Sequence, residues 1–536
     1  MPVLWGKLID HDRCIGCHAC SVACKSENDV PLGSFRTWVK QVEKGAGLAT
    51  RRHFGVLRCN QCERAPCVAI CPTAAMHRRP DGIVDFDNEI CIGCKACIQA
   101  CPYDAIYIDP RSNTAAKCNF CAHRLEVGLE PACVAACPTG ALVVSDLEDA
   151  ESPVAEVLAR YATNVRKPEL GTQPKVFYKG ADQCVLDPRA AARPAQGYWG
   201  SNRADTSEPA PPIPSQNPKG RPLGPRPLPL LAEDPPLQGA PAAARVAYDV
   251  PREGSPWGAK ISAYLTTKAI GAGALMVGGL ALLTEAPATR VGVFPPLIAL
   301  VMMVVTSLLL VADLRRPERF LLLLLRPQPK SWLVRGAFAL MAGAVVASVW
   351  GILLYAAPQL PSGVWQGIGA AAIAAGAAAA GYTAFLFAQA RGRAFWQSPL
   401  LLPHLIVQAV IAGCGTLALL PGLVPDPIQP ARWLALGGLL APALVLNLVM
   451  IAAELWSHGN EDARYAARWL QEGERGVGLT YGVLVFGHVF PLVALAAALM
   501  LPGAAMAVPV AGTAALVGLA LWDHLYVLAG QAPPLS

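Results

Sequence analysis

The sequence predicts two parts: an α+β domain built around cysteine-rich loops, followed by an all-α bundle of eight transmembrane helices. Two observations support this fold class. Of the 18 cysteines, all but two lie at or before Cys137, and apolar stretches long enough to cross a bilayer recur after residue 257. The chain is 54% hydrophobic and 15% charged, whereas about 25% of residues are charged in soluble domains. We expect a cysteine-rich domain at residues 1–186, a linker at 187–256 and a membrane domain at 257–536.

The sixteen early cysteines form four runs. The first and third runs are spaced C-x2-C-x2-C-x3-C, the second C-x2-C-x4-C-x3-C, and the fourth C-x2-C-x11-C-x3-C. Bacterial ferredoxins bind [4Fe–4S] clusters with runs of this kind. We therefore expect a tandem bacterial-ferredoxin-like domain whose four clusters conduct electrons. The expected ligands are Cys14, Cys17, Cys20, Cys24, Cys59, Cys62, Cys67, Cys71, Cys91, Cys94, Cys97, Cys101, Cys118, Cys121, Cys133 and Cys137.

The runs are expected to exchange their fourth cysteines. In two-cluster ferredoxins the first three cysteines of a run bind one cluster and the fourth binds the other. A proline follows the fourth cysteine in the last three runs, whereas Lys25 follows Cys24. Runs two and three are close in sequence and complete one such fold, which leaves run one to pair with run four. The predicted groups are set A (Cys14, Cys17, Cys20, Cys137), set B (Cys24, Cys118, Cys121, Cys133), set C (Cys59, Cys62, Cys67, Cys101) and set D (Cys71, Cys91, Cys94, Cys97).

Positive charge next to the ligand cysteines affects the reduction potentials of the expected clusters. Lys25, Lys95 and Lys117 each adjoin an expected ligand, and positive charge there would favour the reduced state of a nearby cluster. The expected ligands include no histidine of the Rieske type, which raises a potential. Because iron–sulfur potentials span roughly −700 to +450 mV, the sequence leaves the order of the four potentials open.

Three other interpretations of the cysteines remain. Disulfides would suit a secreted mini-protein, but the start of the sequence shows no signal peptide. Zinc accepts four cysteines, and the wide gap in the fourth run would suit a zinc ribbon. Clusters could also be purely structural, although four in one unit favour conduction. Cys184 and Cys414 lie outside the runs, and we assign them no role because a lone buried thiol is usually a small core residue.

Proline marks the linker. The stretches 208–214 and 221–229 are rich in proline, which lacks an amide donor and fixes φ, so they are expected to run as an extended spacer. Such a connection implies two units that could once have been separate polypeptides. The net charge of +6 gives no case for nucleic-acid binding, and no phosphate-binding glycine loop or nucleophile motif is recognisable.

Eight apolar stretches of the length needed to span a bilayer, roughly 20 residues, follow the linker. Loops on the side shared with the cysteine-rich domain hold most of the arginines and lysines, whereas the opposite side has Arg290 and Arg432. The positive-inside rule then places the cysteine-rich domain and both termini in the cytoplasm, at a bacterial inner membrane, and the sequence shows no twin-arginine leader. The expected spans are 262–283, 293–312, 335–356, 366–388, 398–420, 433–455, 480–501 and 508–529.

Ionisable side chains inside these spans are candidates for function because burying them in lipid is costly. Seven are expected in the half nearest the clusters, where a quinone headgroup would receive electrons and protons. A histidine, tyrosine or carboxylate can bind quinone carbonyls and pass protons. The alternative is that most are interfacial anchors. The candidates for quinone binding are Lys268, Asp313, Tyr382, His404 and Glu454, with Asp523 and His524 in the same half.

His488 and Asn447 are expected near the middle of the bilayer. They could belong to a proton route, or they could be a hydrogen-bonded packing pair. A haem b site would need two facing histidines at matching depth, and no convincing pair is recognisable, so no haem is expected.

Both halves resemble known families. The opening Trp5-Gly-Lys-Leu-Ile-Asp, Cys14-Ile-Gly-Cys17-His-Ala-Cys20, Cys59-Asn-Gln-Cys62 and Cys91-Ile-Gly-Cys94 resemble the four-cluster subunit of dimethyl-sulfoxide-reductase-type molybdenum enzymes, over about residues 1–185. The segments 312–320, 331–336 and 381–383 resemble the polysulfide-reductase, NrfD-type membrane anchor. The resemblance implies four clusters that relay electrons between a molybdopterin catalytic subunit and an eight-span anchor that binds menaquinone or ubiquinone. Many relatives face outward, whereas the loop charges here favour an inward orientation.

The sequence thus predicts an electron-transfer and quinone-reactive subunit of a membrane-bound molybdopterin oxidoreductase, in contact with lipid and the quinone pool. No catalytic motif for the primary substrate is recognisable, so a separate catalytic partner is expected. Three alternatives remain. The chain could be a stand-alone ferredoxin:quinone oxidoreductase, or a redox-driven proton-translocating module supported by His488 and Asn447. It could also be an anchor whose clusters only stabilise the fold.

Overall fold

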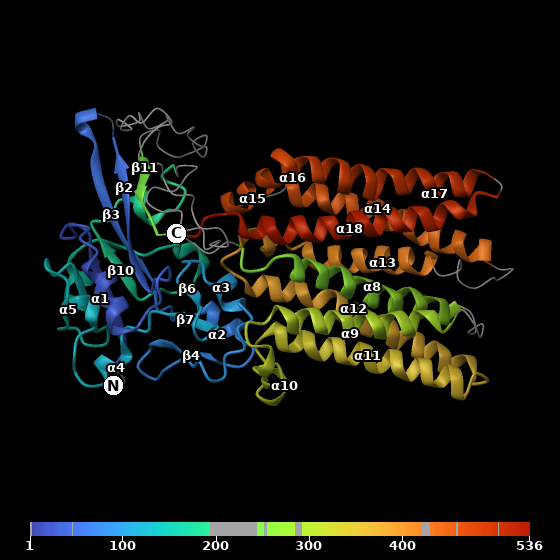
Figure 1. The fold of residues 1–536 in the computed structure, drawn as a ribbon, viewed down its shortest axis with the longest axis horizontal. Helices are drawn as coiled ribbons and strands as arrows, with labels where there is room; N and C mark the ends of the chain where they lie inside the picture. Colours follow the sequence, from blue (N-terminus) through green and yellow to red (C-terminus); the bar gives the residue numbers. More distant parts are fainter. Residues whose placement is uncertain are drawn as a thin grey trace, which may run out of the picture.

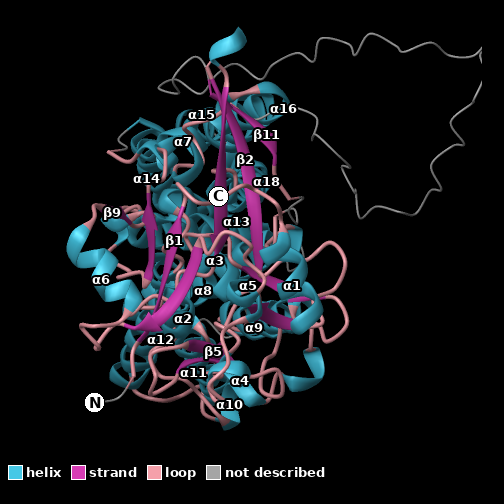
Figure 2. Ribbon diagram, turned by 90° about the vertical axis from the view of Figure 1, so that its left-hand side faces the viewer, coloured by secondary structure: helices cyan, strands magenta, loops and turns pink. Residues whose placement is uncertain are grey.

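A computed structural model describes residues 3–45, 47–192, 244–250, 255–284, 292–419, 429–456, 459–501 and 503–536. The strands gather in a domain at one end of an elongated bundle of long helices (Figure 1). Viewed from that end, the strands lie in front of the helix ends (Figure 2). The C-terminus returns to the cysteine-rich domain, where Arg166 Nη2 donates to the carbonyl of Leu535 at 3.0 Å. The expected fold class is confirmed, with a strand-rich domain followed by a helical bundle.

The four-stranded sheet brings the first and fourth cysteine runs together. Its order is β8-β1-β10-β9. Strand β1 leads into the first run, and β8, which follows the fourth run, pairs antiparallel with it in the register Leu8↔Val143. Runs more than a hundred residues apart in the chain thereby lie side by side. The strands are β1 (Trp5–Asp10), β8 (Leu142–Asp146), β10 (Val176–Lys179) and β9 (Thr163–Asn164).

The remaining strands form a three-stranded sheet, β11-β2-β3, and two hairpins, β4-β5 and β6-β7. Strand β11 lies within the range expected to be a linker. It forms because Ala244 and Val246 alternate with exposed or half-buried residues and bury one face against β2. The proline-rich stretches 208–214 and 221–229 lie outside the described residues. The strands are β2 (Thr37–Lys44), β3 (Arg51–Arg58), β4 (Met76–Arg78), β5 (Val84–Phe86), β6 (Ile106–Asp109), β7 (Thr114–Lys117) and β11 (Ala244–Tyr248).

Short helices hold the third and fourth cysteines of the runs. Helix α1 contains both Cys20 and Cys24, and α3 contains Cys97 and ends just before Cys101. A spacing of three or four residues is one helical turn, so the two cysteines of each pair lie on one side of their helix. The helices of this domain are α1 (Ala19–Glu27), α2 (Pro66–Ile70), α3 (Ala96–Ala100), α4 (Ala122–Leu125), α5 (Ala132–Ala135), α6 (Pro153–Arg160) and α7 (Gln183–Leu186).

Runs one and three adopt the same loop. Gly16 and Gly93 both have φ of 67°, and the residues before the helices, His18 and Lys95, have φ of 61° and 63°. Positive φ is readily available to glycine and strained for other residues. The shared Cys-Ile-Gly-Cys sequence therefore encodes one tight loop twice.

Eight helices among the described residues are long and apolar enough to cross a membrane, which confirms the expected number. The central helix is α8, which packs against α9, α12 and α13. The seventh span is one continuous helix, Gly473–Met500, that includes a π-helical stretch, Gly478–Val489, and it begins seven residues before the expected 480. The other spans are α8 (Ala259–Thr284), α9 (Phe294–Asp313), α11 (Trp332–Ala356), α12 (Ser362–Gln389), α13 (Leu401–Leu419), α14 (Gln429–Trp456) and α18 (Ala507–Gln531).

Two short helices outside the spans were not expected from the hydropathy. Helix α10 (Leu322–Leu325) and helix α15 (Glu461–Gln471) lie at the end of the bundle that carries the cysteine-rich domain (Figure 1). Helix α15 is amphipathic, with Ala463, Ala466 and Leu470 buried. Its polar residues reduce its mean hydropathy, so a search for long apolar stretches passes over it.

Glycine allows the central helices to approach closely. A Cβ added to Gly273 of α8 would collide with the carbonyl oxygen of Ala409 in α13, and one added to Gly376 of α12 would lie 2.6 Å from that of Ala272 in α8. Small residues at such crossings let backbones pack by van der Waals contact in lipid. The crossing of α8 with its neighbours therefore depends on the absence of side chains.

Replacing Gly273 with alanine is expected to destabilise the bundle by about 1–3 kcal/mol, the usual cost of forcing extra volume into a packed core. The measurement is the midpoint of thermal unfolding in mild detergent. Gly351→Ala in α11 is the matched control, since an added Cβ there meets nothing within 4 Å and alanine favours a helix. Equal unfolding midpoints for the two variants would contradict this account of the crossing.

Candidate functional site

The structure groups the sixteen cysteines into the four predicted sets. The four thiols of set A line one cavity, and those of set D line another. In set B, Cys24 interacts electrostatically with the other three thiols. In set C, Cys67 does the same with its three partners. Each set thus has four thiols close enough to act on one centre.

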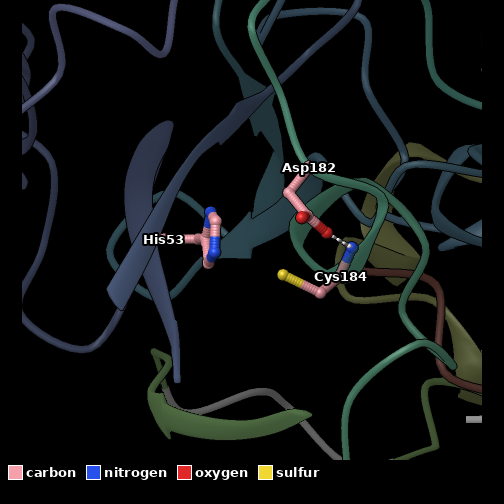
Figure 3. A group of neighbouring side chains, drawn as sticks. All are labelled: His53, Asp182 and Cys184. Atoms are coloured by element: carbon pink, nitrogen blue, oxygen red, sulfur yellow. Dashed lines mark hydrogen bonds between the residues drawn. The ribbon is translucent and has the colours of Figure 1, made fainter. Parts of the chain in front are cut away.

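Cys184 lies apart from the sets, beside His53 of β3 and Asp182 (Figure 3). The possible ligand atoms of these three residues lie within 4.8 Å of one another. However, the ammonium of Lys44 lies 2.8 Å from the Asp182 carboxylate, and its positive charge opposes a further cation there. Asp182 also accepts a hydrogen bond from the backbone N–H of Cys184 at 2.9 Å and thereby caps α7. We therefore assign this group to holding α7 in place.

Buried cations surround the thiols of set B. Arg58 donates from Nη1 to Cys133 Sγ at 3.4 Å and from Nη2 to Cys118 Sγ at 3.3 Å, and Lys7 Nζ donates to Cys133 Sγ at 3.1 Å. Burial alone raises the pKa of the Cys133 thiol, but the charges of Arg58 and Lys7 outweigh it and lower the pKa to about 6. Two buried cations aimed at sulfur need an anionic partner, which thiolates bound to an iron–sulfur cluster provide. The residues present therefore fit such a cluster.

The three lysines next to ligand cysteines in the sequence do not donate to the thiols. Lys25 donates to the carbonyls of Pro31 and Ser34 at 2.9 and 2.6 Å, and Lys117 donates to the carbonyls of Val84 and Cys118. Lys95 forms an ion pair of 2.7 Å with Asp313. Adjacency in the sequence therefore did not identify the cations that donate to the thiols, because these three lysines bond to oxygen atoms instead.

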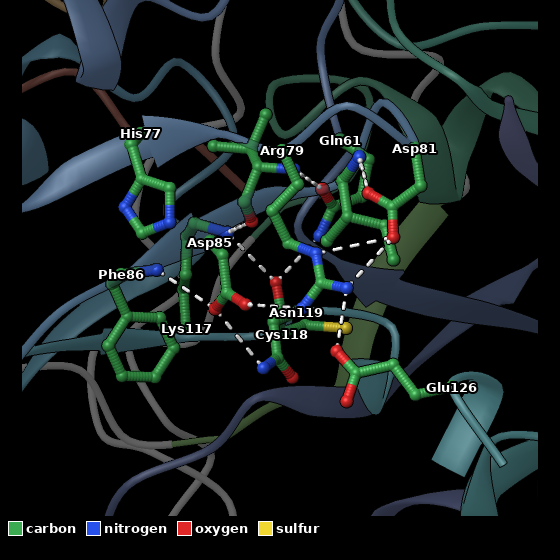
Figure 4. Close-up of polar contacts among 12 residues, drawn as sticks. Gln61, His77, Arg79, Asp81, Asp85, Phe86, Lys117, Cys118, Asn119 and Glu126 are labelled. Atoms are coloured by element: carbon green, nitrogen blue, oxygen red, sulfur yellow. Dashed lines mark hydrogen bonds and ion pairs between the residues drawn. The ribbon is translucent and has the colours of Figure 1, made fainter. Parts of the chain in front are cut away.

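The four sets lie in the order A, B, C, D. Sets A and B share α1, and sets C and D share α2 and α3. Between B and C, Gln61 of the second run donates to the carbonyl of Cys118 at 2.8 Å and accepts from the N–H of Val84 at 2.7 Å. Figure 4 shows Gln61, Lys117 and Cys118 within this network of polar contacts. The result is a continuous row of cysteine sets.

Set D lies against the membrane bundle. The indole N–H of Trp257, just before α8, donates to the carbonyl of Cys94 at 3.3 Å. The N–H of Arg315 donates to the carbonyl of Gly93 at 3.2 Å, and the N–H of Gln328 donates to that of Pro72 at 2.9 Å. Loops after α9 thus contact both cysteine runs that supply set D. At the other end of the row, Cys17 of set A is exposed.

A buried polar contact stabilises the interface between the cysteine-rich domain and the membrane bundle. Arg393 Nε donates to Gln99 Oε1 at 2.7 Å, and Gln99 Nε2 donates to Gln531 Oε1 at 2.7 Å. Burial lowers the pKa of the Arg393 guanidinium to about 10, so it stays charged at neutral pH. The rings of Trp257 and Trp396 stack beside this contact with centroids 5.6 Å apart. These residues were not found by sequence reasoning, since no local pattern reveals which residues meet across an interface.

Two of the quinone candidates meet between α8 and α12. Lys268 Nζ donates to Thr383 Oγ1 at 2.6 Å and to the carbonyl of Ala380 at 2.9 Å, and it lies 5.0 Å from the centre of the Tyr382 ring. Tyr264 shares a hydrogen bond of 2.9 Å with Thr383. Each of these side chains is buried. A cation and two phenols are therefore held together inside the bundle.

Two further candidates form a second group. His404 Nδ1 of α13 lies 3.1 Å from Glu454 Oε1 of α14, and each side chain is only 1% exposed. Gln408 lies 3.2 Å from His404 Nε2. Asp523 of α18 interacts electrostatically with both Lys268 and His404 and so links the two groups. The fifth candidate, Asp313, lies apart from them and is paired with Lys95 of set D's loop.

The other two histidines in the described spans, His488 and His524, have polar partners. His488 Nε2 lies 2.8 Å from Asn447 Nδ2, and its Nδ1 lies 2.8 Å from the carbonyl of Val483. His524 Nδ1 lies 3.2 Å from Ser262 Oγ. Both ring nitrogens of His488 are engaged, which agrees with the packing interpretation. Cys414 is buried among apolar residues of α13 and its neighbours.

Three family models match the chain. A 4Fe-4S binding domain matches residues 5–26, a 4Fe-4S dicluster domain matches residues 51–147, and NrfD, described as polysulphide reductase, matches residues 250–534. The last match covers more than half of the chain. The chain belongs to the NrfD polysulphide reductase family. It joins a 4Fe-4S domain and an NrfD membrane domain in one polypeptide.

Known relatives match the cysteine-rich part. A tetrathionate reductase subunit of Salmonella typhimurium is 47% identical over 197 residues, which cover 36% of this chain and 78% of that protein. A polysulfide reductase polypeptide of Wolinella succinogenes is 44% identical over 180 residues, or 33% of this chain and 94% of that protein. A putative dimethyl sulfoxide reductase iron-sulfur subunit of Halobacterium salinarum is 38% identical over 206 residues, or 32% and 78%. The resemblance expected from the motifs of each half is confirmed.

Separate replacement of Cys20 and Cys24 with alanine tests the pairing of the runs. Although both cysteines lie on α1, they belong to different sets, so each variant is expected to lose a different cluster signal in electron paramagnetic resonance spectra. Cys137→Ala is expected to lose the same signal as Cys20→Ala, because both belong to set A. Loss of one common signal from Cys20→Ala and Cys24→Ala would refute the crossed pairing.

Proposed function

We propose that this chain is the electron-transfer and quinone-reactive subunit of a membrane-bound molybdopterin oxidoreductase. Sets A to D would each hold one [4Fe–4S] cluster, and the four clusters would carry electrons between a catalytic partner and the quinone pool. The observation that supports this most strongly is the row of cysteine sets, which runs from the exposed Cys17 to the loops that contact the membrane bundle. Such a row connects an open surface with the membrane.

The exposed end of the row is the proposed docking surface for the catalytic subunit. Ile15, between two cysteines of set A, is 58% exposed, and Val22 on α1 is 66% exposed. Apolar side chains at the surface next to a redox centre suit a protein interface. Several relatives are named as parts of tetrathionate, polysulfide and dimethyl sulfoxide reductases, which supports a partner that acts on a small sulfur compound or a related substrate.

The proposed quinone site lies at the two linked polar groups near set D. Lys268 and Tyr382 offer a cation and a phenol to quinone carbonyls, and His404 with Glu454 can hold and release a proton. Charged side chains buried in a bundle are costly and are usually retained for function. Asp313 is excluded from this proposal, since Lys95 already pairs with its carboxylate. Menaquinone and ubiquinone both offer the carbonyls that this proposal requires.

We further propose that the cysteine-rich domain faces the cytoplasm. The helix ends and loops on its side contain Arg315, Arg316, Arg319, Arg391 and Arg393. The positive-inside rule favours such loops in the cytoplasm. Some of these arginines also serve the interface, as when Arg319 donates to the carbonyl of Cys91 at 3.1 Å. Accessibility of a protease-cleavable tag at the C-terminus, in intact and in opened cells, tests this orientation.

Anaerobic purification in mild detergent tests the proposed function. We expect about sixteen irons per chain, four for each of the four sets, together with bound quinone and a partner that contains molybdenum. Sixteen irons and quinone without molybdenum or a partner would instead support a stand-alone ferredoxin:quinone oxidoreductase. Cluster-free protein would contradict both.

Replacing Lys268 with glutamine is expected to slow the reduction of the clusters by a quinol by about a hundredfold, the lower end of the range for loss of a positioned acid–base group. The measurement is stopped-flow bleaching of the cluster absorbance. Lys260→Gln is the matched control on the same helix, because Lys260 is exposed and, among the described residues, donates to the carbonyl of Ala312. An equal rate in both variants would remove Lys268 from the quinone site.

A further inference from the structure

Positive charge is distributed unevenly along the row of cysteine sets. At set B, Arg58 and Lys7 donate to the sulfurs of Cys118 and Cys133 at 3.1 to 3.5 Å. Arg58 is 1% exposed and Lys7 is 0% exposed. Within the described part of the chain, no carboxylate forms an ion pair with either cation. Their charge therefore acts on the sulfurs without a neutralising neighbour.

The cations near the other sets are neutralised or bound to oxygen. Lys95 beside set D is paired with Asp313 at 2.7 Å. Near set C, the charge of the buried Lys117 acts on Cys67, but its ammonium donates to the carbonyls of Val84 and Cys118 and not to sulfur. Arg393 donates to Gln99 and to the carbonyl of Gln531, and Arg166 donates to the carbonyls of Leu186 and Leu535. The sulfurs of set D accept from backbone N–H groups, as Cys71 does from Met76 at 3.4 Å. Among the described residues, charged donors contact ligand sulfur at set B alone.

Such donors have a defined effect on a cluster. Reduction adds one negative charge, which N–H···S bonds and nearby cations stabilise, so they raise the reduction potential. The effect is large where the cations are buried, because the local dielectric constant is low. Arginine remains charged at every relevant pH, so the contribution of Arg58 is permanent.

We propose that Arg58 and Lys7 give the cluster of set B the highest reduction potential of the four. This inference rests on the proposed function, since it requires a cluster at each set. Set B is second in the row, between the exposed set A and set C. In a partly reduced protein the first electron therefore resides at set B, away from the surface and from the membrane interface. The row thus contains an internal electron reservoir.

The test is a potentiometric titration of the full chain in detergent, followed by electron paramagnetic resonance. In the unaltered protein, the first signal to appear on reduction is expected to be the one that Cys24→Ala removes. Arg58→Gln is expected to shift the midpoint potential of that signal in the negative direction, and by more than the signal of set A, whose Cys20 also feels the charge of Arg58. Arg58→Lys, which keeps the charge with fewer donors, is expected to give a smaller shift.

Two further variants complete the test. Lys7→Gln removes the second cation independently and is expected to shift the same signal in the same direction, so the inference remains testable if Arg58→Gln fails to fold. Arg111→Gln is the control, because this exposed arginine pairs with the carboxylates of Asp29 and Asp109, which neutralise its charge. An unchanged highest potential in Lys7→Gln and in a folded Arg58→Gln protein with all its iron would overturn the inference. Fewer than four clusters in the unaltered protein would contradict the proposed function instead.

Discussion

One geometric constraint underlies the cysteine-rich domain: the third and fourth cysteines of a run are one helical turn apart and face different sets. Cys20 and Cys24 on α1 serve sets A and B, and Cys97 and Cys101 at α3 serve sets D and C. Each short helix therefore joins two sets at a distance fixed by its own pitch. The pairing of β1 with β8 joins the outer runs, and the contact of Gln61 with Cys118 joins the two halves. Without this crossing there would be separate centres rather than a row.

Features that depend on local sequence patterns could be predicted from the sequence. Ligand spacing defined the cysteine sets, and hydropathy defined the eight spans, because both depend on residues that are close along the chain. Strand β11 and helix α15 were missed, since their sequences are short and mixed in polarity. The candidates Lys268 and His404 were found because an ionisable residue in an apolar stretch is conspicuous, whereas their partners Thr383 and Gln408 were not.

Features that depend on distant residues could not be predicted. Arg58 and Lys7 contact the sulfurs of set B only because β3 and β1 pass beside α5 and the fourth run. The lysines next to ligands in the sequence looked more promising, yet Lys25 and Lys117 donate to carbonyls. Asp313 was a quinone candidate because it lies at the end of the second span nearest the clusters, but Lys95 from the other domain pairs with it. In each case the partner came from another part of the chain.

Strand β11 has a consequence for assembly. It belongs to the segment that leads into α8, yet it pairs with β2 of the cysteine-rich domain, and Arg245 on it contacts Glu43 at 2.8 Å. In the Wolinella protein the region that matches makes up 94% of the polypeptide, whereas in this chain the same region is joined covalently to the membrane bundle. Here the contact is intramolecular, and its effective concentration is set by the tether rather than by expression levels. The two halves are therefore always present in equal numbers, and dilution into detergent does not by itself separate them.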